Sequence, residues 1–456
     1  MIKHLKLRIP SGKPSTGTRI LAATFLLLIP VLFRPFVHGP DAVGYYAWLR
    51  QAVIEHTLDV GNAFHHYAPE FSPLPEAAFN LRTPTGYTHD QWASGSAILW
   101  LPMYLVAHGG VLLARVLGAN NPADGYSWPY PLAASLASAL YGLAAIWLTY
   151  QLARHIVGEF AATVAALVSW LATPTVFYMY CQPLISHAND AFVNALFVYV
   201  WWRTRETYAP RTGLARGLVA GLAMWVRPQN AVLTALLGLE TLVDLAIALR
   251  SKCHPQSVLL RGLFTLTGFL IAFAPLLLFW RTVYGAWIVN TYTATQGSAI
   301  FDWRAPHLLQ VLFSSNRGLF VWAPVTLPAL VGLWRLSRIH TRLAALLLGM
   351  FMAQLYVVGS WFDWSGAVSF GPRFWVNMTI VFGMGLAALI NRRWPRSIWI
   401  ALAGIFVIWN LLLIVQYSLN TVPHSGAVDL VKMIQHQFTI IPENLQRILH
   451  ALIVRQ

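Results

Sequence analysis

Asp41 is the acidic residue of this 456-residue sequence that is best placed to do chemistry. It lies a few residues after the first apolar segment, in the stretch GPDAVGYY that starts at Gly39. Pro40 suits the first turn of a helix, which we expect to run to about Thr57, with Tyr45 one turn after Asp41 on the same face. The carboxylate could act as a general base, or it could simply cap the helix by accepting backbone N–H groups.

Three arginines stand where the chain should leave the membrane on its outer side, against the usual preference of basic residues for the cytoplasmic side: Arg227, Arg317 and Arg373. Each could extend to lipid head groups, or could bind a phosphate through paired N–H donors. His187 and Asp190 stand three residues apart at the start of an apolar segment. They could form a structural hydrogen-bonded pair, and two ligands are too few to predict a metal site.

The composition of the chain indicates that lipid surrounds much of it. Hydrophobic residues make up 57% of the chain and charged residues 10%, against about 25% charged residues in an ordinary soluble domain. A soluble protein of this size could not bury so much apolar surface, so we expect a membrane protein. The net charge of +15 is then explained by basic cytoplasmic loops, and nucleic acid is not an expected partner.

Apolar segments of roughly 17–24 residues, the length that a bilayer core requires, set the predicted architecture. They begin near residues 20, 130, 159, 188, 213, 229, 258, 318, 342, 374 and 397. We therefore predict an all-α polytopic membrane protein with about 11 transmembrane helices. One membrane domain covers residues 1–417, its first outer loop covers 39–129, and a tail at 418–456 contains amphipathic segments that should lie on the outer membrane surface.

Short basic connections predict the orientation. The connections at 203–211, 250–261, 335–342 and 392–396 are rich in arginine and should be cytoplasmic, which places the N-terminus inside and the C-terminus outside. This order works only if the apolar stretch 97–117 does not cross the membrane and lies along the outer face. The alternative is that it crosses and that another apolar segment forms a hairpin.

Acidic residues should gather on one side of this membrane. Of the 16 in the chain, all but Glu159, Glu206, Glu240 and Asp244 are expected on or near the outer face. Ionisable groups at a membrane are costly, so the chemistry is expected on the outer side. The outer tryptophans, among them Trp92, are expected mainly to anchor the chain at the interface.

Several short motifs follow one another in an order that resembles a known family. They are Asp41 with Tyr45 and Tyr46, LDVGN at 58–62, QWASGS at 91–96 before WLP at 100–102, SHA at 186–188, WVRPQ at 225–229 and SFGPRF at 369–374. Together they resemble the GT-C glycosyltransferases of the bacterial membrane, which are related to protein mannosyltransferases and to the aminoarabinose transferases of lipid A. The resemblance covers residues 20 to about 417.

This resemblance implies a bundle of membrane helices with juxtamembrane helices in the first outer loop. It also implies transfer of a sugar from a polyprenyl-phosphate donor, at the outer face of the bacterial inner membrane, to a glycan, lipid or protein acceptor. Asp41 matches the catalytic carboxylate of the family. Relatives often carry a second acid directly after it, whereas this chain has Ala42, so Asp59 and Asp90 are the candidates for that role.

The same hypothesis assigns the remaining candidates. Arg373, with Arg227 or Arg317, would bind the donor phosphate, while the expected substrate-binding residues are Tyr45, Tyr46, His187 and Asp190. A leaving group that is already an anion needs positive charge, so neither a metal nor a cofactor is expected. The alternative function is a secondary transporter or a lipid flippase of the inner membrane. Such proteins often consist of repeated halves, and no repeat is visible here.

Overall fold

The computed structural model describes residues 14–71, 80–252, 254–297, 300–390 and 393–453. Within these ranges the chain is helical, without a strand, and only two isolated bridges pair Arg82 with Thr88 and Phe301 with Trp361. The prediction of an all-α protein is therefore confirmed.

Every apolar segment predicted to span the membrane forms helix. These helices are α1 (Thr16–Leu32), α5 (Pro129–Val157), α6 (Glu159–Leu171), α8 (His187–Thr204), α9 (Pro210–Val226), η4 with α10 (Pro228–Asn230, Ala231–Ser251), α11 (Pro255–Tyr284), α14 with α15 (Leu319–Trp322, Thr326–Ser337), α16 (Thr341–Ser360), η5 with α17 (Arg373–Met378, Thr379–Leu389) and α18 (Arg396–Ser418). Shorter helices connect them: α7 (Thr175–Tyr180), α12 (Thr293–Gln296) and α13 (Leu308–Phe313).

Among the described residues, six helical segments are long and apolar enough to cross a membrane: Gly95–Val116, Pro129–Val157, Pro228–Ser251, Pro255–Tyr284, Thr341–Ser360 and Arg396–Ser418. The protein is thus a multi-pass membrane protein, while the count of eleven spans stays a prediction.

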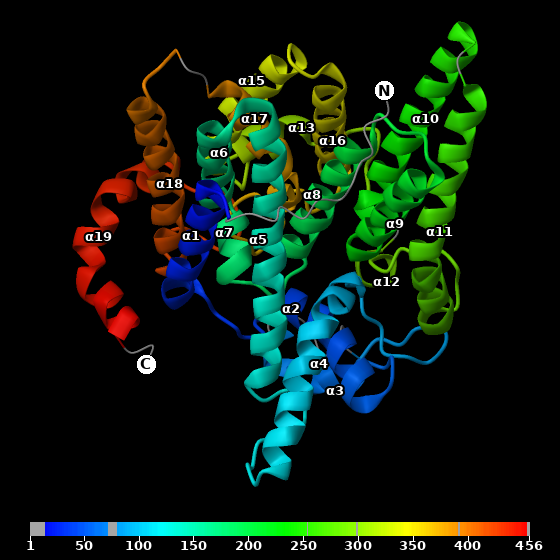
Figure 1. Cartoon of the computed structure of the whole chain (residues 1–456). Helices are drawn as coiled ribbons and strands as arrows, with labels where there is room; N and C mark the ends of the chain where they lie inside the picture. Colours follow the sequence, from blue (N-terminus) through cyan, green and yellow to red (C-terminus); the bar gives the residue numbers. More distant parts are fainter. Residues whose placement is uncertain (1–13, 72–79, 253, 298–299, 391–392, 454–456) are drawn as a thin grey trace.

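The predicted first outer loop contains helices of its own, as expected. They are α2 (Gly39–Arg50), continued by η1 (Gln51–Glu55), α3 (Gly61–His66), η2 (Ala68–Phe71) and α4 (Gly95–Val116). In Figure 1, α2, α3 and α4 lie together at the lower end of the bundle, which we call the loop end, and α5 reaches down to them. α4 could cross a membrane by length and composition, so its location outside the membrane stays a prediction.

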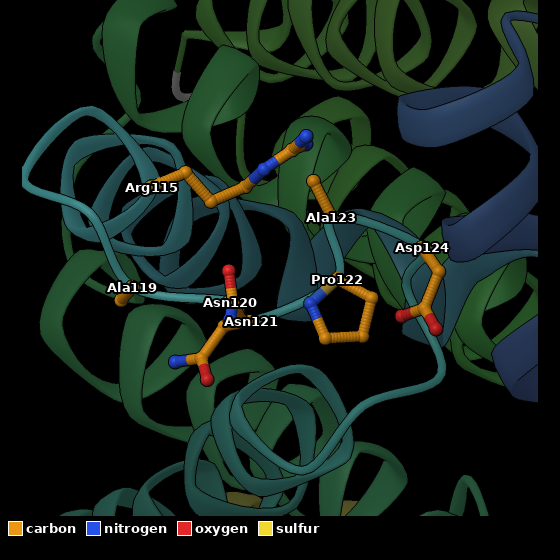
Figure 2. A pocket seen from close by; sticks show the side chains of 7 residues that line it. All are labelled: Arg115, Ala119, Asn120, Asn121, Pro122, Ala123 and Asp124. Atoms are coloured by element: carbon orange, nitrogen blue, oxygen red, sulfur yellow. The ribbon is translucent and has the colours of Figure 1, made fainter.

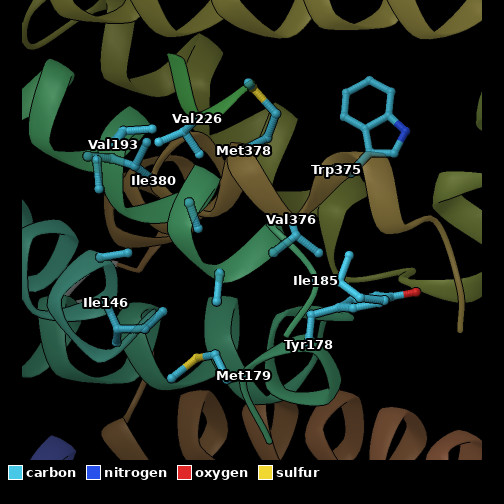
Figure 3. Close-up of a cluster of buried hydrophobic side chains, with 14 of the residues drawn as sticks. Ile146, Tyr178, Met179, Ile185, Val193, Val226, Trp375, Val376, Met378 and Ile380 are labelled. Atoms are coloured by element: carbon cyan, nitrogen blue, oxygen red, sulfur yellow. The ribbon is translucent and has the colours of Figure 1, made fainter. Parts of the chain in front are cut away.

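The core lies between α5, α7, α8, α9 and η5 with α17. Figure 3 shows buried side chains from these elements packed against one another, among them Ile146, Tyr178, Val193, Val226 and Ile380. This packing fixes the N-terminal end of α8, the C-terminal end of α9 and the start of η5 relative to one another. His187 begins α8, Arg227 directly follows α9, and Arg373 begins η5.

The C-terminal segment forms one helix, α19 (Leu430–Ile453), with a non-helical residue at Asn444 that follows Pro442. The predicted amphipathic segments of the tail, at 428–438 and 445–454, therefore fall on the two sides of a kinked helix, apart from residue 454, which lies outside the described residues. α19 packs beside α18, and the Gln416 side chain donates a hydrogen bond to the Met433 carbonyl at 3.2 Å (Figure 1). Its position at the outer membrane surface stays a prediction.

Candidate active site

Asp41 lies in the first turn of α2, and both its carboxylate oxygens face side chains from distant parts of the chain. Oδ1 accepts a hydrogen bond from the Trp92 indole N–H at 2.8 Å, and Oδ2 accepts one from Arg373 Nη1 at 2.5 Å, although Arg373 is 332 residues away in sequence. The first backbone N–H of the helix, that of Gly39, is bonded instead by Glu70 at 2.8 Å. The Asp41 carboxylate therefore accepts hydrogen bonds from side chains, and Glu70 caps the N-terminal end of α2.

Solvent still reaches the Asp41 carboxylate. Its side chain is 28% exposed, while that of Arg373 is 13% exposed. The guanidinium and the indole N–H together fix the orientation of this carboxylate. Its remaining exposed surface is what an incoming hydroxyl group could contact.

Arg227 and Arg373 both contact the ring of Phe374. The guanidinium carbons of Arg227 and Arg373 are 5.7 Å and 5.3 Å from the centre of that ring. Arg227 Nη1 is 2.8 Å from His187 Nδ1, and its Nε is 3.7 Å from Asp190 Oδ2. Two cations and one carboxylate thus share one partly buried site at the loop end of the bundle.

Asp190 acts on this site through Arg227. It is fully buried in the first turn of α8, and its Oδ1 accepts hydrogen bonds from Asn230 at 2.7 Å and Asn194 at 2.9 Å. The amides satisfy one oxygen, which leaves the other turned toward Arg227. Asp190 and His187 therefore orient the Arg227 guanidinium.

The Tyr45 side chain lies near Asp41 and the two arginines, Arg227 and Arg373. The side chain is buried one turn after Asp41, and burial raises the pKa of its phenol, while the charge of Arg227 opposes this rise. Asp41 also raises the pKa of Tyr45 and Arg373 lowers it, so all three charges act on the same ring. Tyr45 therefore lies near these three charged groups, and its role in substrate binding stays a prediction.

Other predicted residues do not reach this site. The Tyr46 hydroxyl donates to the Gly125 carbonyl at 2.6 Å and holds the loop after α4. Asp59 Oδ1 accepts the backbone N–H groups of Gly61 at 3.0 Å and Thr88 at 3.1 Å, so this carboxylate organises the first outer loop.

Asp90 contributes indirectly. Its Oδ1 accepts the backbone N–H of Trp92 at 2.8 Å, two residues on, and so positions the indole that binds Asp41. The side chain is completely buried, and burial raises the pKa of the Asp90 carboxyl well above its usual range. The buried Asp90 carboxyl has no exposed surface that an acceptor hydroxyl group could contact, so Asp90 is a positioning residue for Trp92.

Arg317 is turned away from the site. Its guanidinium donates to the backbone carbonyls of Ser369 at 3.1 Å, Gly426 at 2.5 Å and Pro423 at 2.9 Å. The remaining Nη1 contact is to Asn316 at 3.2 Å. These acceptors occupy most of its N–H groups, so Arg317 ties the loop before η5 to the segment after α18.

Two residues of the site were missed by the sequence reasoning. Trp92 was assigned to the membrane interface, although its place in the QWASGS motif was a signal that it has a specific role. Asp363 lies in the loop before η5, where burial raises the pKa of its carboxyl and the nearby Arg373 lowers it. Asp363 is thus a second carboxylate close to Arg373. The sequence of the loop around Asp363 does not predict this proximity.

A separate surface pocket lies where α4 ends, away from these residues. Figure 2 shows the side chains that line it: Arg115, Ala119, Asn120, Asn121, Pro122, Ala123 and Asp124. None of the predicted site residues lines this pocket. In the described ranges, no three His, Cys, Asp or Glu side chains come together in a way that could hold a metal ion.

Comparison with known proteins gives no sequence match but a shared fold. No protein-family model and no curated protein matches the sequence. Among solved structures, ArnT from Cupriavidus metallidurans bound to undecaprenyl phosphate is 14% identical, with a TM-score of 0.50 over 92% of this chain and 75% of that chain. Its apo form is 16% identical at a TM-score of 0.47, with the same coverage.

The oligosaccharyltransferase of Archaeoglobus fulgidus is 11% identical at a TM-score of 0.44, over 94% of this chain and 55% of that chain. The likeness to the undecaprenyl-phosphate complex of ArnT shows that this chain shares the fold of ArnT. The expected fold class is therefore confirmed.

Proposed function

We propose that this protein is an inverting glycosyltransferase of the GT-C type. It takes a sugar from a polyprenyl-phosphate donor and transfers it to an acceptor hydroxyl group. The observation that carries the proposal is the meeting of Asp41 with Arg373 and Arg227 in one partly buried site. The fold shared with ArnT, whose structure contains undecaprenyl phosphate, supports a lipid-phosphate donor.

Asp41 is the proposed general base. In the transfer step, the acceptor oxygen forms a bond to the anomeric carbon of the sugar while its proton passes to the Asp41 carboxylate. The bond between the anomeric carbon and the phosphate oxygen breaks, and the electron pair leaves with the polyprenyl phosphate. One displacement inverts the anomeric centre, and a positioned base contributes roughly 10²–10⁴-fold to such a step.

Arg373 and Arg227 are the proposed phosphate ligands. Charge on the leaving phosphate increases in the transition state, and fixed guanidinium groups in a partly dehydrated site stabilise it. Arg373 Nε is buried and has no hydrogen-bond partner among the described residues, so it is free to bind a phosphate oxygen. Arg227 is held in place by His187 and Asp190.

The membrane arrangement follows from the same proposal. The loop end faces the periplasm, the N-terminus is cytoplasmic, and the protein lies in the bacterial inner membrane. Residues 1–417 form the catalytic membrane domain, and 418–456 form a tail at the outer surface. The clusters of arginine in the connections at the opposite end support this orientation.

The test is donor consumption by the purified full-length protein. The protein is incubated with a polyprenyl-phosphate hexose, water takes the place of the acceptor hydroxyl group, and loss of the donor with release of free hexose is followed by chromatography and mass spectrometry. We expect the wild-type protein to release polyprenyl phosphate and Asp41→Asn to be inactive.

Asp302→Asn is the matched control. Asp302 is an exposed carboxylate whose Oδ1 accepts the backbone N–H groups of Arg304 and Ala305, both at 3.0 Å. Movement of the intact lipid across vesicle membranes without loss of its sugar would instead indicate a flippase and would overturn the proposal.

A further inference from the structure

A second charged site lies at the opposite end of the bundle from the loop end. We call it the distal charge cluster, and its charged members come from α9, α10, α11 and α16: Arg216, Glu240, Asp244, Arg261 and Arg342. Thr204, at the end of α8, also belongs to it. Because α8 begins at His187 and rises about 1.5 Å per residue, the cluster is about 25 Å from the candidate active site along the bundle. The proposed transfer reaction does not use it.

Two ion pairs form the inside of the cluster. Arg216 Nη1 is 3.0 Å from Glu240 Oε2, and its Nε donates to Thr204 Oγ1 at 2.8 Å. Arg261 Nη2 is 2.7 Å from Asp244 Oδ2. Both guanidinium groups are buried, since Arg216 is 2% exposed and Arg261 is 1% exposed.

These buried arginines retain unused donors. Arg216 Nη2 and Arg261 Nη1 are inaccessible and have no hydrogen-bond partner in the part of the chain that the structure describes. Unsatisfied N–H groups of a buried cation are strongly unfavourable, and native proteins rarely leave them so. Two such donors in one cluster are available to an acceptor that is not part of the described chain, and we consider below which ligand would supply it.

The backbone keeps the two arginines close together. Gly213, one turn before Arg216, lies so near α11 that a Cβ atom there would be 2.4 Å from the Arg261 carbonyl oxygen. Small residues at such crossings let membrane helices pack backbone to backbone. The distance between the two guanidinium groups is therefore set by rigid helices, as a preformed binding site requires.

The cluster also has an accessible side. Arg342 Nη2 is 3.7 Å from Asp244 Oδ1, and the Arg342 side chain is 63% exposed. Tyr208 is 38% exposed, and its ring lies 4.4 Å from the guanidinium carbon of Arg261. The neighbouring surface of α10 and α11 is apolar, with Leu242 66% exposed and Leu263 58% exposed. In Figure 1 these two helices stand at the edge of the bundle, where lipid would contact them.

The charge of the cluster limits the ligand. Three arginines face two carboxylates, which leaves one net positive charge. A phosphodiester has one negative charge and two non-bridging oxygens, which matches this net charge and the two free donors. Basic pockets between membrane helices on the cytoplasmic side commonly bind such head groups.

We propose that the distal charge cluster binds the phosphodiester group of an anionic phospholipid in the leaflet opposite the candidate active site. The acyl chains lie along the apolar faces of α10 and α11, Arg342 and Tyr208 contact the head group from outside, and Arg216 and Arg261 donate to its phosphate oxygens. The site is distinct from the donor site and does not depend on transferase activity.

The test counts lipids retained by the purified full-length protein in native mass spectra. The detergent-solubilised protein is mixed with phosphatidylglycerol or with phosphatidylcholine, and retention is compared between wild type, Arg342→Gln and Arg338→Gln. Arg338 is an exposed basic residue on the connection before α16 and is not part of the cluster, so it is the matched control. We expect Arg342→Gln to weaken phosphatidylglycerol retention about fivefold and Arg338→Gln to leave it unchanged.

Three results would overturn the proposal. One is equal retention of the two lipids by the wild type, and another is an equal effect of the two arginine substitutions. The third is displacement of phosphatidylglycerol by excess inorganic phosphate, which would assign the cluster to a free anion. If Arg342→Gln does not fold, Arg261→Lys keeps the charge next to Asp244 but removes the planar pair of donors, and we expect a comparable loss.

Discussion

Replacement of Asp41 by Asn should separate catalysis from donor binding. In the structure Arg373 donates to Asp41, and in the proposed reaction the same guanidinium binds the donor phosphate. The phosphate, bound at the free Nε, would therefore share the Arg373 guanidinium with the Asp41 carboxylate, whose negative charge competes with it for the same cation. Asp41→Asn removes the competing charge and the general base together, so affinity and turnover should change in opposite directions.

The size of the affinity change follows from the contact. The Arg373–Asp41 pair is short, at 2.5 Å, but Asp41 is 28% exposed, so solvent screens part of its charge. A hydrogen bond between charged groups contributes about 1.5–3 kcal/mol, and we take the lower limit because of this exposure. About 1.4 kcal/mol corresponds to tenfold in affinity, so undecaprenyl phosphate should bind Asp41→Asn about tenfold more tightly than wild type. Turnover should fall by roughly 10²–10⁴-fold.

The assay combines two measurements on the same preparation. Binding of undecaprenyl phosphate is titrated by thermophoresis in detergent, and turnover is followed as loss of a polyprenyl-phosphate hexose. Asp302→Asn should change neither quantity. Unchanged or weaker lipid binding in Asp41→Asn would refute competition for Arg373, and near-normal turnover would refute the role of Asp41 as base.

Three further predictions test individual contacts of the site. Arg373→Ala should weaken undecaprenyl-phosphate binding by about tenfold or more, because a charged hydrogen bond is lost. Arg317→Ala should mainly lower the melting temperature, since Arg317 donates to backbone carbonyls. Equal loss of affinity in both variants would contradict this assignment. Asp90→Asn should keep turnover, because an asparagine oxygen can still accept the Trp92 backbone N–H. Burial raises the pKa of the Asp90 carboxyl, so the folded state loses stability as the pH rises through that pKa, and the melting temperature of the wild type should fall with rising pH more than that of Asp90→Asn. Gly44→Ala should reduce turnover by about tenfold or more, because the new Cβ would lie 2.0 Å from the Trp92 ring and displace the indole from Asp41. Gly109→Ala is the control and should be neutral, because its new Cβ meets nothing within 4 Å. Similar turnover in the two variants would exclude a role for the indole.

Local composition was enough to predict the helices. Each apolar segment became helical because a backbone in lipid must satisfy its own hydrogen bonds, a requirement that holds whichever helix packs beside it. The helix from Gly39 followed in the same way, since Pro40 and the tyrosine spacing are visible within one turn of sequence, whereas the helices of the first outer loop and the catalytic role of Asp41 were implied by the family resemblance, and that role stays a prediction.

Side-chain partners could not be predicted on this basis. Arg227, Arg317 and Arg373 look alike in sequence, each at the end of an apolar segment, but Arg317 is surrounded by carbonyls and Arg373 by a carboxylate. Asp59 and Asp90 likewise look as reactive as Asp41 until the structure shows backbone N–H groups bonded to both.

The sequence by itself determined that the chain is a membrane protein and which of its segments are helical. It also limited the candidates for chemistry to a few residues. Hydropathy and helix signals depend on neighbours within a few residues, so they can be read without the fold. The tertiary structure alone decided that Asp41 meets Arg373 across 332 residues, and that Arg216 and Arg261 lie together at the opposite end. Those contacts depend on how whole helices pack, and packing brings together residues that no local pattern relates.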